Sequence, residues 1–215
     1  ADVAEGSTLA RFSVALFAGL WGLRLFFSLL IRVRHEPEDG RYQALRAAWN
    51  GSPVKLFVFF QGQAVIVALF SLPFIAAANN TNVTLDFWFF AAVAVFILSV
   101  AGESLADRQL AAFRNNPANR GKTCRNGLWA WSRHPNYFFE WLHWFAYLFL
   151  AIGSPQFWLS LVGPVVMLAF LYRVSGIPWT EAQALRSRGD DYRRYQSEVS
   201  AFFPLPPKPS KNGVL

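Results

Sequence analysis

The sequence predicts an all-α integral membrane protein, a bundle of about five transmembrane helices. Of its 215 residues 54% are hydrophobic, 17% are aromatic and only 15% are charged, a composition typical of membrane proteins rather than of soluble domains. A transmembrane helix needs about 20 mainly apolar residues, and five stretches qualify, of which the fourth is the shortest. They are residues 9–31, 54–78, 85–102, 137–152 and 157–174.

The positions of lysine and arginine predict the orientation. The net charge is +7, and the cations gather mainly in residues 32–55, 108–133 and 173–211, whereas residues 79–84 and 153–156 contain none. With five spans these two sets lie on opposite sides, so the positive-inside rule predicts a multi-pass protein whose C-terminus is on the cytoplasmic or equivalent side. Topology therefore explains the basic balance, and we expect membrane lipids rather than nucleic acid as partners.

Helical patterns continue outside the spans. A short one follows the first span, at residues 42–49, and the third span runs on through "ESLADRQLAAFR" as a helix that projects beyond the bilayer. After the fifth span a helix is expected to start at Thr180 and Glu181 and to stop at Gly189. A second, amphipathic pattern contains Tyr192, Tyr195 and Val199, and it ends in "FFPLPP", an unstructured tail or a packing strap.

We expect one membrane domain over residues 1–207, with its core at 85–207, and a tail at 208–215. Cys124 is the only cysteine, which excludes an internal disulfide and a thiolate metal cage. Asn79 and Asn82 begin glycosylation acceptor patterns on the side opposite the cations.

Asn136, Glu140, His143 and Tyr147 form a polar face on the fourth predicted span, at i, i+4, i+7 and i+11. Ionisable side chains inside a membrane are costly and usually face the bundle interior, so they are functional candidates. Alternatively, Glu140 pairs with an arginine of the first span, for which Arg24 is available. Glu140 and His143 also fit one Glu-x-x-His motif of di-iron bundles, but the second copy that such a centre needs is missing, so no metal site is expected.

The third span and its extension carry a second polar face, with Glu103, Asp107 and Arg114 at i, i+4 and i+11. The alternative is that this face is only solvated where the helix leaves the membrane. Guanidinium and ammonium groups near it would attract a phosphate-bearing cofactor. These cations are Arg114, Arg120, Lys122, Arg125 and Arg133.

Three runs, "ADRQLAAFR", "GLWAWSRHPNYFFEW" and "EAQALRSRGDDYRRYQSEVSAFFPLPP", resemble the C-terminal domain of the steroid 5α-reductase family, in particular its bacterial-type relatives. The resemblance covers roughly residues 21–207 and is strong over 107–140. It implies a helical membrane bundle, open to the cytoplasm, that holds NADPH for reduction of a carbon–carbon double bond conjugated to a carbonyl.

The resemblance also implies which residues hold the cofactor. We therefore predict a membrane-embedded, NADPH-dependent oxidoreductase acting on the CH–CH bond of a lipid-like enone, with His143 or Tyr147 as the catalytic donor to the substrate carbonyl. The positions that match the family's cofactor-binding residues are Asp107, Arg114, Gly127, Leu128, Asn136 and Glu140.

Two other functions remain open. The chain also resembles isoprenylcysteine carboxyl methyltransferases, a distant sister group that binds S-adenosylmethionine. A non-catalytic structural subunit of a larger membrane complex, without a cofactor, is the other alternative, because Phe139 stands where both groups have glycine and Trp21 where the reductases have tyrosine. The methyltransferase-like pattern consists of Arg133, His134, Pro135 and Tyr137, followed by Glu181, Gly189, Tyr192 and Tyr195.

Overall fold

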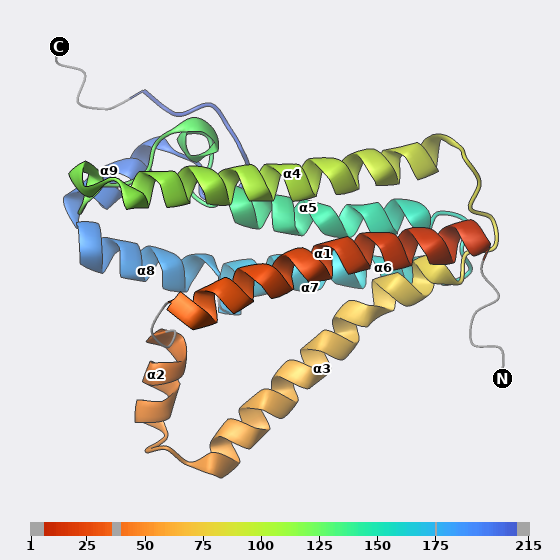
Figure 1. The fold of residues 1–215 in the computed structure, drawn as a ribbon, viewed down its shortest axis with the longest axis horizontal. Coiled ribbons are helices and arrows are strands. Elements are labelled where there is room, and N and C mark those ends of the chain that lie inside the picture. The colour runs from red at the N-terminus through yellow and green to blue at the C-terminus, as the bar shows by residue number, and fades with distance from the viewer. Residues whose placement is uncertain (1–6, 36–39, 175, 210–215) are drawn as a thin grey trace. The chain divides into compact units, whose positions relative to one another are not determined.

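The computed structural model describes residues 7–35, 40–174 and 176–209, and its regular elements in these ranges are all helices (Figure 1). Four helical segments are long and apolar enough to cross a membrane, which confirms the predicted class of fold. They are α1 (Thr8–His35), α3 (Pro53–Ala78), α4 (Phe87–Asn115) and the helical run Phe157–Arg188. The fourth predicted span is α5 (Pro135–Leu150), whose 16 residues make it shorter than these four.

The chain divides into two compact units. Unit 1 combines Ala1–Thr84 with Leu150–Gly163, and unit 2 combines Leu85–Phe149 with Pro164–Leu215. The candidate site residues of α4, α5 and the loop between these helices all lie in unit 2, so the geometry below is that of unit 2 alone. The expected arrangement of one membrane domain over residues 1–207 with a tail stays a prediction.

In unit 1, α1 and α3 converge at one end and diverge towards α2 (Gly40–Ala48), the short helix predicted after the first span (Figure 1). The short helix α6 (Phe157–Ser160) packs on α3. Pro53 begins α3 at a position where its missing N–H is not needed.

Three asparagines join the connection after α3 to the connection after α5. Asn80 is buried, and its Nδ2 donates to the carbonyl oxygens of Leu150 and Ile152, both at 2.8 Å. The amides of the two glycosylation acceptors donate as well, Asn79 to Gln156 Oε1 at 3.2 Å and Asn82 to Gly153 O at 2.9 Å. We call Asn79, Asn80 and Asn82 the asparagine cluster.

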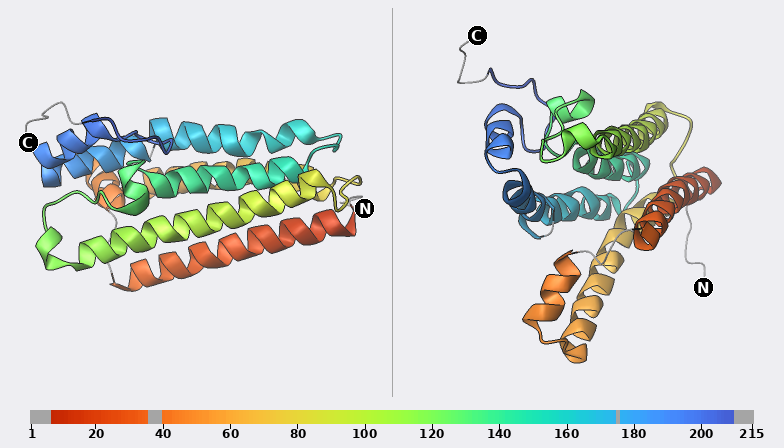
Figure 2. Two further views of the ribbon diagram at one scale, coloured as in Figure 1. Left: turned by 90° about the horizontal axis from the view of Figure 1, so that it is seen from above. Right: turned by 60° about the vertical axis from the view of Figure 1, so that its left-hand side comes forward.

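In unit 2, α4 begins at a side-chain cap and is longer than a bilayer is thick. Asp86 Oδ1 accepts from the N–H of Phe89 at 3.0 Å, which satisfies one of the free donors of the first turn. With 29 residues α4 measures about 43 Å, against about 30 Å for the hydrocarbon core. The predicted continuation of the third span is confirmed, and α5 runs beside α4 (Figure 2).

The fifth predicted span is helical but not uniform. It consists of α6, α7 (Val162–Ala169) and the π-helical turn η3 (Phe170–Val174). The next helix, α8 (Ile177–Arg188), starts three residues before the predicted Thr180, because Pro178 is tolerated in a first helical turn. It stops at Gly189 as predicted, where φ is +52°, and α9 (Asp190–Glu198) follows.

The segment after α9 is a packing strap. Ser132 Oγ donates to Phe202 O at 2.8 Å, and the N–H of Leu205 donates to Trp131 O at 3.0 Å. Phe202 is buried, and its ring lies 5.8 Å from that of Phe138 and 5.7 Å from that of Trp141. Of the two alternatives for "FFPLPP", the strap is therefore correct.

Candidate functional site

Two predicted cofactor-binding residues on different helices are hydrogen-bonded. Asn136, in the first turn of α5, donates from Nδ2 to Oδ1 of Asp107 in α4 at 3.2 Å. Its amide oxygen accepts from the N–H of Tyr137 at 3.0 Å, which sets the orientation of the amide. Asp107 is exposed and Asn136 half-buried, so the pair lies at the surface of unit 2.

The turn that contains Gly127 and Leu128 rests on the same helix. It is the 3-10 helix η2 (Gly127–Ala130), and the N–H of Leu128 donates to Oε1 of Gln109 at 3.0 Å. Gly127 has φ of +58°, and a Cβ there would lie 2.3 Å from Gln109 Nε2. A side chain at position 127 is therefore disfavoured by the backbone conformation, and it would displace the Gln109 amide from its place beside the turn. Gln109, two residues after Asp107, was not among the predicted site residues.

A basic pocket of about 250 Å³ opens at the end of α4. Cys124 lines it, and burial raises the pKa of this thiol despite the nearby cations, so it stays protonated at neutral pH. Phe113 adds an aromatic ring. Four cations also line the pocket. Arg114 comes from α4, Arg120 and Lys122 from the loop after η1 (Pro117–Asn119), and Arg188 from α8.

The Asp107–Asn136 pair and the basic pocket lie along one face of α4. Arg114 follows Asp107 by seven residues, which is two helical turns and about 10 Å. Leu110, between them on this face, also lines the pocket. The predicted alignment of Glu103, Asp107 and Arg114 on one helix is therefore confirmed.

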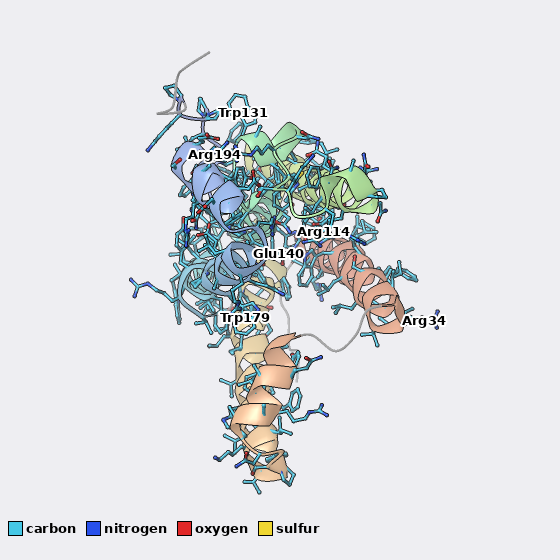
Figure 3. All side chains as sticks on the ribbon, turned by 90° about the vertical axis from the view of Figure 1, so that its left-hand side faces the viewer. Arg34, Arg114, Trp131, Glu140, Trp179 and Arg194 are labelled. Carbon is cyan, nitrogen blue, oxygen red and sulfur yellow. The ribbon has the colours of Figure 1, made fainter. Side chains whose placement is uncertain are left out.

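Glu140 is half-buried on α5, one turn after Asn136. Arg114 and Glu140 are labelled in Figure 3, in a view from the end of unit 2 at which α9 lies. All four residues of the polar face predicted for the fourth span lie on α5, and Asn136 is in the first turn of this helix.

His143 and Tyr147 form a buried pair farther along α5. The hydroxyl of Tyr147 and Nε2 of His143 are 3.0 Å apart, and both side chains are fully buried. The ring of Phe96 lies 5.6 Å from the imidazole, and that of Trp144 lies 6.0 Å from it. These aromatic rings limit the access of water to the pair.

Phe139 fills the space between α4 and α5. It is 9% exposed, and a Cβ added at Gly102 of α4 would lie 2.4 Å from Cε1 of its ring. The phenylalanine on α5 is thus matched by a glycine on α4. This match was not apparent in the sequence, since the two positions are 37 residues apart.

A second polar group, the Glu181 cluster, consists of Arg133, His134, Glu181 and Gln196. Arg133 Nε donates to Glu181 Oε1 at 2.7 Å, and Gln196 Nε2 donates to Glu181 Oε2 at 2.7 Å. His134 Nε2 lies 3.3 Å from Glu181 Oε1. Burial lowers the pKa of His134, although its bond to Glu181 acts in the opposite direction. The cluster joins the entrance of α5 to α8 and α9.

The Glu181 cluster bears on the phosphate hypothesis, which stays a prediction. Arg133 also donates to the carbonyls of Gln196 and Val199, at 2.9 and 2.7 Å, and does not line the basic pocket. Arg125 is bound to Glu198 and to Asp191. Two of the five expected phosphate-binding cations are thus committed to ion pairs, because long side chains bridge loops that the sequence does not show to be adjacent.

The tyrosines of the methyltransferase-like pattern are core residues. Tyr192 and Tyr195 are 3% and 1% exposed, and they pack with Ala184 and Val199. Tyr195 donates its hydroxyl to the carbonyl oxygens of Trp129 and Ser132.

The chain belongs to the DUF1295 family, described as proteins of unknown function, whose model matches residues 2–199. Neither a curated protein nor a solved structure matches the chain.

Proposed function

We propose that this member of the DUF1295 family is a membrane-embedded, NADPH-dependent reductase that acts on the carbon–carbon double bond of a lipid-like enone. One observation carries the proposal: the Asp107–Asn136 hydrogen bond and the basic pocket containing Arg114 share one face of α4. A cofactor with a polar ring at one end and phosphates at the other needs such a pair of subsites.

The basic pocket fits phosphate better than it fits a whole cofactor. Four cations surround about 250 Å³, whereas complete small-molecule sites usually measure about 300–1,000 Å³. Arg114, Arg120, Lys122 and Arg188 would bind phosphate oxygens, and Phe113 offers a ring for stacking. The rest of the cofactor would extend along α4 towards Asp107 and Asn136, beside the turn of Gly127 and Leu128 and with Glu140 one turn away.

NADPH would supply the hydride, and the protein would supply orientation, exclusion of water and an electrophile for the substrate carbonyl. The hydrogen-bonded pair of His143 and Tyr147 is our candidate for that electrophile, because a hydroxyl held by an imidazole can donate a proton. The aromatic rings of Phe96 and Trp144 favour an apolar, lipid-like substrate.

A non-catalytic membrane subunit is the second candidate. Its support is Phe139, which packs on Gly102 at the position where the resembling enzymes have glycine, together with exposed aromatic side chains such as Phe87 and Phe90. A methyltransferase that binds S-adenosylmethionine is supported only by the shared sequence pattern. Its distal glutamate, Glu181, already bonds to Arg133 and Gln196.

Titration calorimetry of the detergent-purified protein with NADPH, NADH and S-adenosylmethionine separates these functions. The reductase proposal expects NADPH to bind, and Arg114→Ala to weaken it about 10–100-fold, since a charge-assisted hydrogen bond contributes about 1.5–3 kcal/mol. Arg194→Ala is the matched control, because this arginine is also exposed but does not line the pocket.

Binding of S-adenosylmethionine instead would support the methyltransferase. If the folded protein binds none of the three ligands, the enzymatic proposals are wrong, and co-purification of other membrane subunits becomes the expected result.

A further inference from the structure

In unit 1, α2 and the beginning of α3 form a helical hairpin that is held together by aromatic side chains. After α2 the chain turns through Asn50 and Gly51, whose φ angles are +49° and +68°, and enters α3 at Pro53. The ring of Tyr42 stacks on that of Phe60 with centroids 6.4 Å apart. Gln63 Nε2 donates to the Tyr42 hydroxyl at 3.4 Å, so α2 is held against the first turns of α3.

An apolar groove of about 370 Å³ lies at this turn. Val54 and Val58 are 70% and 63% exposed, and the ring of Trp49 closes on that of Phe59 with centroids 5.8 Å apart. The groove has one charged group in its lining, the ammonium of Lys55. The lining residues are Trp49, Val54, Lys55, Val58 and Phe59.

The five residues that line the groove include one cation, Lys55, and no acidic residue. The groove lies at the turn from α2 into α3. This turn directly precedes the apolar part of α3, a candidate membrane span, so the groove lies where acyl chains meet head groups. Tryptophan and lysine are typical of that level of a membrane.

We propose that this groove binds an anionic phospholipid, with the first part of an acyl chain against Val54, Val58 and Phe59 and the phosphate at the Lys55 ammonium. An apolar groove alone would accept any lipid chain, but the Lys55 ammonium in its lining selects a negative head group. The proposal concerns unit 1 and is independent of the reductase function, whose residues lie in unit 2.

Native mass spectrometry of the whole protein in detergent tests it, with phosphatidylglycerol and phosphatidylcholine of identical acyl chains as probes. The protein is expected to bind phosphatidylglycerol about fivefold or more in preference, since one cation near a membrane surface accounts for about that factor. Lys55→Gln should remove most of the preference. Lys208→Gln, the same change at an exposed site in the strap, should leave it intact.

Val58→Gln makes the groove polar without changing the charge, and it should weaken the binding of both lipids. Equal binding of the two lipids by the unaltered protein would overturn the proposal. So would an unchanged preference in Lys55→Gln, because the site would then lie elsewhere. Far-ultraviolet circular dichroism verifies that each variant is folded before its binding is compared.

Discussion

The contact between Gly102 and Phe139 predicts that replacing Gly102 changes the free energy of unfolding in opposite directions, depending on whether the Phe139 ring is present. We consider Gly102→Ala in the natural chain and in Phe139→Ala. In the natural chain the new methyl group would lie 2.4 to 2.5 Å from three atoms of the Phe139 ring. Such atoms normally stay about 3.5–4.0 Å apart, and the ring is buried, so it must move.

Two contributions of opposite sign set the magnitude. Overpacking of this kind costs about 1–3 kcal/mol, whereas alanine is favoured over glycine in a helix by about 1 kcal/mol. Gly102→Ala should therefore lower the free energy of unfolding by up to about 2 kcal/mol in the natural chain. In Phe139→Ala the ring is absent, and the same change should raise it by about 1 kcal/mol. The coupling between the two sites is then about 1–3 kcal/mol.

The assay is a double-mutant cycle with unfolding by denaturant in detergent, followed by circular dichroism. Gly62→Ala in α3 is the control, because no atom lies within 4 Å of the added Cβ, and its effect should not depend on Phe139. If Gly102→Ala has the same effect in both backgrounds, the two side chains do not share this space and our account of Phe139 is refuted.

Three further predictions concern stability in detergent, measured by denaturant or thermal unfolding. Glu181→Gln should cost about 3–5 kcal/mol, because Glu181 and Arg133 are only 15% and 12% exposed, whereas Asp190→Asn in an exposed pair should change little; equal effects would contradict the buried pairing. Because burial lowers the pKa of His134 below its unfolded value of about 6.5, the unfolded state binds more protons below that pH, so the unfolding temperature should fall as the pH drops through about 6.5. A His134→Gln variant that kept the same pH dependence would show that another group titrates. Asn80→Ala leaves two carbonyls without their buried donor and should cost about 1–3 kcal/mol, so a variant as stable as the natural protein would argue against the asparagine cluster.

Local patterns in the sequence were enough to predict the helices. Long apolar runs predicted the spans, Gly189 predicted the stop of α8, and the continuation of α4 to Asn115 followed from its good helix formers. The predicted start of α8 was three residues late, because a proline is tolerated in a first helical turn and Pro178 lies there.

From the sequence, the arrangement of the candidate site could be predicted only for residues on the same helix. Periodicity placed Asp107 and Arg114 on one face of α4, but no local pattern shows that Arg133 meets Glu181, 48 residues later. For the same reason the sequence did not show that Arg125 and Arg133 are held in ion pairs, or that Arg188, from α8, lines the basic pocket. Which partner a long charged side chain takes is decided by how distant loops meet.

The asparagine cluster and the Glu181 cluster constrain how often the chain crosses the membrane. Asn80 bonds to Leu150 and Ile152, so these residues lie on the same side, and the number of crossings between them must be even. With α4, a candidate span, as one crossing, the short helix α5 is expected to be the return. The bond between Arg133 and Glu181 likewise requires an even number of crossings between these two residues, which α5 and the run that begins at Phe157 provide. Two independent pairs of contacts therefore support α5 as the fourth of five spans, although its length alone does not.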